Sequence, residues 1–101
     1  MTALPTTQRF YRGHRVRIGA MPEHMSHFPS DCDAIVEYSY AEKYGGREPR
    51  NSRQYGLLLL DAKGWPYNSV SWYDEDQLTL LDPDRDAGEA IIQSYIVGNY
   101  R

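Results

Sequence analysis

At 101 residues the chain has room for one domain, spanning 1–101, with a single core, which excludes a second independently folded unit. Its 41 % hydrophobic and 25 % charged residues exclude disordered, collagen-like and coiled-coil classes. The formal net charge of −3 gives no overall attraction to nucleic acid, although residues 1–53 carry eight basic and six acidic side chains and residues 54–101 carry three and eight.

The cysteine content and the apolar runs bear on the cellular compartment. The single cysteine, Cys32, excludes an intramolecular disulfide framework and favours reducing surroundings. The longest apolar run, residues 57–60, is far too short to cross a bilayer, and residues 1–8 contain no apolar segment typical of a signal peptide. We therefore expect a cytoplasmic protein with no membrane partner.

The first part of the chain predicts two strands separated by an irregular loop. Residues 1–8 contain little to bury and are expected to be flexible. Residues 15–18 alternate polar and apolar side chains, which predicts a strand with Val16 and Ile18 facing inward. Residues 33–40 predict a second strand, in which Ile35 faces away from its neighbours or lies near a bend.

Three further strands are predicted in the second half. Residues 55–61 form a nearly continuous apolar run, which is typical of a central strand, and residues 61–64 predict a hairpin turn. Residues 67–73 and 78–81 predict the fourth and fifth strands. The residues between them, 74–77, are too few for an α-helix and predict a single helical turn.

A C-terminal helix is predicted over residues 86–98. Asp82, Pro83 and Asp84 stop the sheet and offer helix caps. One stripe of the helix is apolar and contains Ile91, Ile92, Tyr95 and Ile96. We expect this short helix to cover one end of a barrel.

Several segments together resemble small SH3-like barrel proteins of the Tudor and KOW type. They are residues 10–18, 34–36, 55–59 and 71–81. The last segment also resembles the closing motif of small phage and prophage proteins. The resemblance implies a mainly β fold, a five-stranded SH3-like barrel with a short C-terminal helix. It also implies binding to a host factor, because such phage proteins often act in this way, the anti-CRISPR proteins being the best-known class.

His24, His27 and Cys32 are the strongest candidates for a metal or catalytic site. Imidazole and thiolate groups are zinc ligands, but a structural zinc site normally closes with four ligands and the sequence offers three. No nucleophile motif and no glycine-rich phosphate loop accompany them. We therefore expect no enzyme activity, no metal and no cofactor, and a zinc-assisted hydrolase stays open as an alternative.

Basic side chains favour a nucleic-acid-binding module of the KOW or Tudor type as the second interpretation. Guanidinium groups bind phosphate, and aromatic rings beside them stack on bases. The candidate residues are Arg9, Arg12, Arg15, Arg17, Arg47, Arg50 and Arg53. Alternating arginines are equally typical of an exposed strand face.

The preferred interpretation is a non-enzymatic module that binds a host protein or protein complex and inhibits or modulates it, as anti-CRISPR proteins do. An exposed Trp65 beside Tyr67 is the kind of anchor that protein interfaces use, although the same rings could pack across the hairpin or line a cage for a methylated side chain. A cluster of carboxylates could meet a basic surface or mimic nucleic acid. The expected binding residues are Trp65, Tyr67, Tyr44, Asp74, Glu75 and Asp76.

Overall fold

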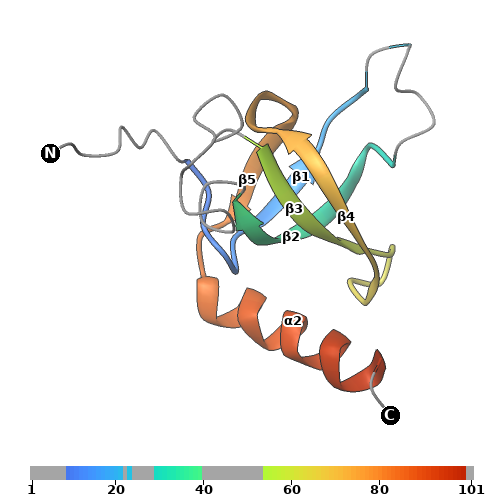
Figure 1. The fold of residues 1–101 in the computed structure, drawn as a ribbon, viewed down its shortest axis with the longest axis vertical. Coiled ribbons are helices and arrows are strands. Elements are labelled where there is room, and N and C mark those ends of the chain that lie inside the picture. Colours follow the sequence, from blue (N-terminus) through green and yellow to red (C-terminus); the bar gives the residue numbers. More distant parts are fainter. Residues whose placement is uncertain (1–8, 22, 24–28, 40–53, 100–101) are drawn as a thin grey trace, which may run out of the picture.

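The fold is mainly β, with one antiparallel sheet and one C-terminal helix (Figure 1). The computed structural model describes residues 9–21, 23, 29–39 and 54–99. The elements are β1 (Arg15–Ile18), β2 (Cys32–Ser39), β3 (Gln54–Leu60), β4 (Pro66–Asp74), the 3-10 turn η3 (Glu75–Gln77), β5 (Leu78–Asp82) and α2 (Arg85–Asn99). The five predicted strands, the single helical turn and the helix are confirmed. The segment expected to be flexible, 1–8, lies outside the described residues.

The five strands lie in the order β4-β3-β2-β1-β5. β2, β3 and β4 follow one another as antiparallel neighbours, and β5 then pairs with β1. Val16 of β1 consequently lies opposite Ala34 on one side and opposite Leu80 on the other. Within the described residues, β4 and β5 are the two edge strands of the sheet.

Both faces of the central strands are buried, which explains the continuous apolar run in β3. Successive side chains of a strand point to opposite faces. Leu57 and Leu59 face the main core, whereas Leu58 and Leu60 face a second, smaller cluster. The main core consists of Phe10, Val16, Ile18, Ala34, Val36, Tyr55, Leu57, Leu59, Tyr73 and Leu78.

The second cluster attaches α2 to the outside of the sheet. Ile92 is fully buried against Ile35, Leu58 and Leu60. Figure 1 shows the helix as a separate layer beside the strands. The predicted apolar stripe is confirmed, but the helix packs on a face of the sheet and not over one end of a barrel, where the sequence predicts it. It packs on a sheet face because β2 and β3 present leucine and isoleucine there.

The start of α2 is capped as the sequence predicts. The Asp84 carboxylate accepts hydrogen bonds from the backbone N–H groups of Asp86 at 3.1 Å and Ala87 at 3.2 Å. These bonds satisfy N–H groups that have no partner inside the helix. Asp84 therefore fixes where the chain leaves β5 and enters the helix.

Candidate functional site

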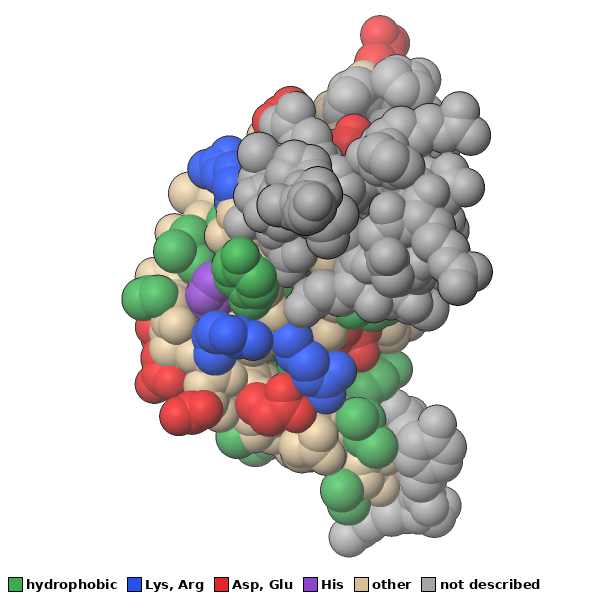
Figure 2. Space-filling model, turned by 60° about the vertical axis from the view of Figure 1, so that its left-hand side comes forward, with side chains coloured by type: hydrophobic (Ala, Val, Ile, Leu, Met, Phe, Trp, Pro, Cys, Tyr) green, Lys and Arg blue, Asp and Glu red, His purple; other side chains and the backbone are tan. Residues whose placement is uncertain are grey.

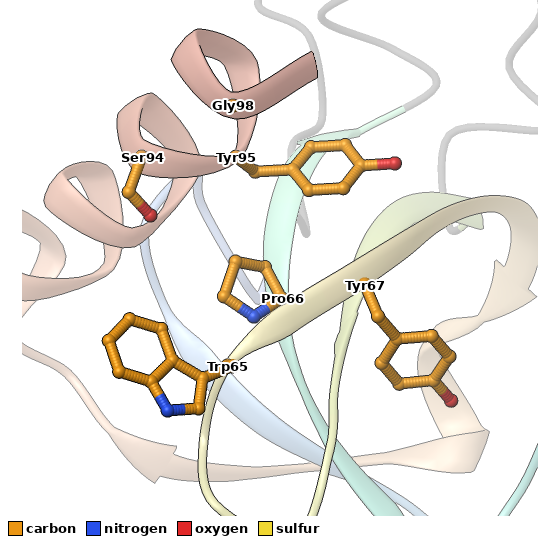
Figure 3. A pocket seen from close by; sticks show the side chains of 6 residues that line it. All are labelled: Trp65, Pro66, Tyr67, Ser94, Tyr95 and Gly98. Carbon is orange, nitrogen blue, oxygen red and sulfur yellow. The ribbon is translucent and has the colours of Figure 1, made fainter.

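An open groove lies between the start of β4 and the C-terminal half of α2 (Figure 3). Its volume is about 390 Å³, and its lining residues are Trp65, Pro66, Tyr67, Ser94, Tyr95 and Gly98. The side chains of Trp65 and Tyr67 are 64 % and 54 % exposed, more than most large aromatic residues in a folded domain. The structure thus brings two predicted binding residues to one surface feature.

The turn between β3 and β4 holds the backbone of Trp65 rigidly. The Asp61 carboxylate accepts hydrogen bonds from the N–H groups of Lys63 at 2.8 Å and Trp65 at 2.9 Å. The backbone N–H of Asp61 donates to the Trp65 carbonyl at 2.9 Å. Gly64 has a φ of 85°, a conformation that favours glycine. The turn therefore fixes the backbone position from which the indole projects.

Tyr67 is exposed because the β3–β4 ladder is irregular at this position. Leu59 pairs with Asn68 and Leu60 pairs with Pro66, so Tyr67 has no partner in the ladder. Such an extra residue is a β-bulge, which bends the strand and redirects a side chain. The bulge turns the phenol ring out of the sheet, on the other side of Pro66 from Trp65 (Figure 3).

The helix side of the groove is formed by three residues spaced along α2. Tyr95 is partly buried and packs against the cluster that attaches the helix to the sheet. Ser94 and Gly98 lie beside it on the same side of the helix, and a Cβ atom at Gly98 would meet no atom within 4 Å. Sequence reasoning missed this half of the site, because no local pattern links residues 94–98 to the hairpin.

The carboxylates expected to form one acidic surface are separated by the fold. Glu75 is 2 % exposed, and its carboxylate accepts hydrogen bonds from the Tyr55 hydroxyl at 2.5 Å and the Arg9 N–H at 3.2 Å. Asp74 and Asp76 remain exposed. Glu75 therefore requires a correction: it belongs to the interior, because η3 directs its side chain toward the core.

The described arginines of the nucleic-acid interpretation lie beside carboxylates. Arg12 forms a two-pronged ion pair with Glu89 at 2.7 and 3.0 Å. Arg15 and Arg17 both bind Asp33, at 2.8 and 3.2 Å. On the face that Figure 2 draws, Lys and Arg side chains lie next to Asp and Glu side chains. This pairing reduces the positive potential that phosphate binding requires.

The other residue of that set within the described part of the chain is Arg9. Its guanidinium group lies 5.3 Å from the centre of the Phe10 ring, and the residue is exposed. Arg47, Arg50 and Arg53 lie outside the described residues. One further described arginine, Arg85, lies beside Arg12: its side chain donates a hydrogen bond to the Arg12 carbonyl at 2.8 Å.

The ion-paired carboxyl groups predict a loss of stability in acid. Hydrogen bonds from Arg12 hold the pKa of Glu89 at about 2, and those from Arg15 lower the pKa of Asp33. A carboxyl group with a lowered pKa in the folded state stabilises the protein at pH values above its ordinary pKa, which is 4.5 for Glu89 and 3.8 for Asp33. This contribution is lost as the pH falls through the folded-state pKa. Because the pairs are partly exposed, each contributes less than about 1 kcal/mol.

Thermal unfolding between pH 7 and pH 2 tests this expectation. As the pH is lowered below about 5, the melting temperature of the unmodified protein should decrease. In a variant with both Glu89→Gln and Asp33→Asn, the melting temperature at pH 7 should be slightly lower and its decrease in acid smaller. An identical acid dependence in the two proteins would contradict the role of these pairs.

The remaining sequence candidates are only partly visible. Tyr44, His24 and His27 lie outside the described residues. Cys32, at the start of β2, is partly buried against the main core, and burial raises the pKa of its thiol. Among the residues that the structure describes, no three His, Cys, Asp or Glu side chains are grouped to hold a metal ion.

No family model, curated protein or solved structure matches this chain. None of the helices in the described ranges combines the length and the apolar character needed to cross a membrane. The groove beside Trp65 and Tyr67 is accordingly identified from the geometry of this chain alone.

Proposed function

We propose that this chain is a non-enzymatic protein-binding module and that the groove beside Trp65 and Tyr67 contacts the partner. One observation supports this most strongly: a turn and a bulge hold two large aromatic side chains in solvent next to a helix. Tryptophan and tyrosine dominate the binding energy of protein interfaces. Neither ring belongs to the two buried clusters of the described residues, so burial in the core does not explain them.

The arrangement of strands supports an SH3-like barrel as the scaffold. The meander from β2 to β4, the 3-10 turn before the last strand and the pairing of β5 with β1 are features that such barrels share. A closed barrel is part of this proposal. The resemblance of residues 71–81 to small phage proteins supports a host protein as the partner, which the chain inhibits or modulates in the cytoplasm.

The groove is a better candidate for the contact surface than the acidic corner. With Glu75 inside the protein, Asp74 and Asp76 alone face solvent there. Asp74 also accepts a hydrogen bond from the Gln54 side chain at 3.2 Å. Two separated carboxylates imitate a nucleic-acid backbone poorly, so the proposal does not rely on mimicry.

Replacing Trp65 by alanine should weaken partner binding without destabilising the protein. Removing an interface tryptophan costs about 2 kcal/mol or more, which corresponds to roughly 30-fold in affinity. Exposed substitutions usually change the free energy of unfolding by less than about 0.5 kcal/mol. The measurement is quantitative mass spectrometry of host proteins retained on the immobilised unmodified chain and on the Trp65→Ala variant.

Val97→Ala is the matched control. Val97 is 61 % exposed on α2 but does not line the groove. Retention should be lost with Trp65→Ala and kept with Val97→Ala, while both variants unfold at the temperature of the unmodified protein. Equal retention of the same host protein by all three chains would contradict a binding role for the groove.

A further inference from the structure

The helix end beside the groove has a negative electrostatic character. The last carbonyl groups of an α-helix have no partner within the helix, and the helix dipole places partial negative charge there. The groove touches Ser94, Tyr95 and Gly98, which belong to the last two turns of α2. The last turn of α2 contains no basic residue to offset this charge.

Two carboxylates, which do not line the groove themselves, lie next to the β4 segment that forms its aromatic part. The Asp61 carboxylate accepts a hydrogen bond from the backbone N–H of Trp65 at 2.9 Å. On the other side, Glu37 accepts a hydrogen bond at 2.5 Å from the hydroxyl of Ser69, two residues beyond Tyr67 in β4. Neither carboxylate forms an ion pair with another described residue.

Lys63, in the same turn, offsets part of the Asp61 charge. The Arg12 side chain donates to the backbone carbonyl of Glu37 at 3.4 Å and forms its ion pair with Glu89. The two carboxylates and the end of α2 are the negative groups on this side of the protein.

The aromatic rings form an open platform, not a cage. In Figure 3 the rings of Trp65 and Tyr67 point away from each other, with Pro66 between them. A cage for a methylated ammonium group needs rings that converge on one point. A planar guanidinium group can instead stack on a single ring while its N–H groups reach neighbouring acceptors.

We propose that the groove binds an arginine side chain carried by an extended basic segment of the partner protein. The guanidinium group stacks on one of the two rings, and its N–H groups face the nearer carboxylate, Asp61 beside Trp65 or Glu37 beyond Tyr67. The segment continues along the exposed residues 67–69 of β4. This inference rests on the proposed function, because it specifies the chemistry of the partner at the same groove.

Selection from a phage-displayed library of random peptides tests the chemistry of the ligand. The full chain is the bait, and clones that also bind the Trp65→Ala variant are discarded. The surviving clones should be enriched in arginine. Survivors without enrichment in arginine, including survivors enriched in lysine alone, would overturn this inference and leave the proposed function intact. A selection without survivors would overturn both.

Calorimetric titration of one selected peptide tests the role of charge. Exchanging its arginines for citrulline, which has nearly the same shape without the charge, should weaken binding about tenfold or more, or 1.4 kcal/mol. A chain with both Asp61→Asn and Glu37→Gln keeps the acceptor oxygens and should bind the arginine peptide about fivefold more weakly. Asp86→Asn, at the far end of α2, is the control and should leave the affinity unchanged. Equal binding of both peptides would contradict the proposal.

Analytical ultracentrifugation of the chain alone tests whether a second copy of the chain occupies the groove. The unmodified chain should sediment as a monomer at the concentrations used for titration. A dimer that Trp65→Ala dissociates would assign the groove to a second copy of the chain and would overturn the proposal.

Discussion

Replacing Gly88 by alanine is expected to lower the free energy of unfolding by about 2 to 4 kcal/mol, because overpacking a close contact costs roughly 1–3 kcal/mol and sometimes more. A Cβ atom on Gly88 would lie 1.7 Å from the carbonyl oxygen of Gly13, which is backbone and cannot rotate away. Gly13 has a φ of 99°, a conformation that other residues rarely adopt. The helix and the segment before β1 can therefore approach this closely only with glycine on both sides.

Neighbouring contacts make this approach hard to relax. The Arg85 side chain donates to the carbonyl of Arg12 at 2.8 Å, and its guanidinium group lies 5.4 Å from the centre of the Tyr11 ring. The Arg12–Glu89 ion pair joins the same two segments. A shift of α2 to accommodate a methyl group would disturb all of these contacts.

Thermal and urea denaturation measure the effect of Gly88→Ala. The melting temperature should fall by about 10 °C or more, given the usual relation for a chain of this size. Gly98→Ala is the control, because it lies in the same helix and its Cβ would meet no atom within 4 Å. That variant should be as stable as the unmodified protein or slightly more so, since alanine favours helix. A Gly88→Ala variant with unchanged stability would contradict the close packing of the two segments.

Replacing Tyr55 by phenylalanine is expected to lower the free energy of unfolding by about 2 kcal/mol, since hydrogen bonds to charged groups contribute roughly 1.5–3 kcal/mol. The Tyr55 hydroxyl is buried, donates to Glu75 at 2.5 Å and accepts from the Arg9 N–H at 3.2 Å. It thus joins β3, η3 and the segment before β1 at one point. Phenylalanine keeps the ring and its packing against Phe10 but removes these bonds.

Tyr73→Phe is the matched control for this change. Tyr73 is 3 % exposed, and its hydroxyl donates at 2.9 Å to the carbonyl of Pro29, an uncharged acceptor. Its loss should cost only about 1 kcal/mol. Urea denaturation of both variants gives the two values, and a cost for Tyr55→Phe no larger than that for Tyr73→Phe would contradict the role assigned to Glu75.

The same two phenols predict a loss of stability in alkali. Burial raises the pKa of Tyr73 to about 12, and burial followed by the hydrogen bond to Glu75 raises that of Tyr55 further. A tyrosine with a raised pKa in the folded state stabilises the protein at pH values below the ordinary tyrosine pKa of 10.0. This contribution is lost as the pH rises through the folded-state pKa. The unmodified protein should therefore lose stability above about pH 10, and Tyr55→Phe should lose less.

The secondary structure could be predicted from the sequence because it is encoded locally. The apolar run 57–60 indicates a strand that is buried on both faces, and this is what Leu57 and Leu58 show by facing different clusters. The cap at Asp84 and the helical turn before β5 follow from short motifs in the same way. Local motifs do not predict which element covers the outer face of the sheet, because this depends on where α2 packs.

The candidate site could be predicted only in part. Trp65 and Tyr67 are recognisable because a turn motif places aromatic residues where burial is difficult. Tyr95 and Gly98 carry no such signal, as their place in the groove depends on the packing of α2. The acidic neighbours of Glu75 predict a surface position, whereas its burial depends on a tyrosine twenty residues away.

The sequence by itself determines the order and boundaries of strands and helix, since hydrophobic period, turn residues and caps act over a few neighbouring positions. Only the tertiary structure decides which charges are neutralised and which rings stay in solvent. Arg12 meets Glu89 across 77 positions, and Trp65 meets the end of α2 across about thirty. Contacts between residues so far apart in the sequence form when apolar faces pack against each other, and local sequence patterns do not predict them.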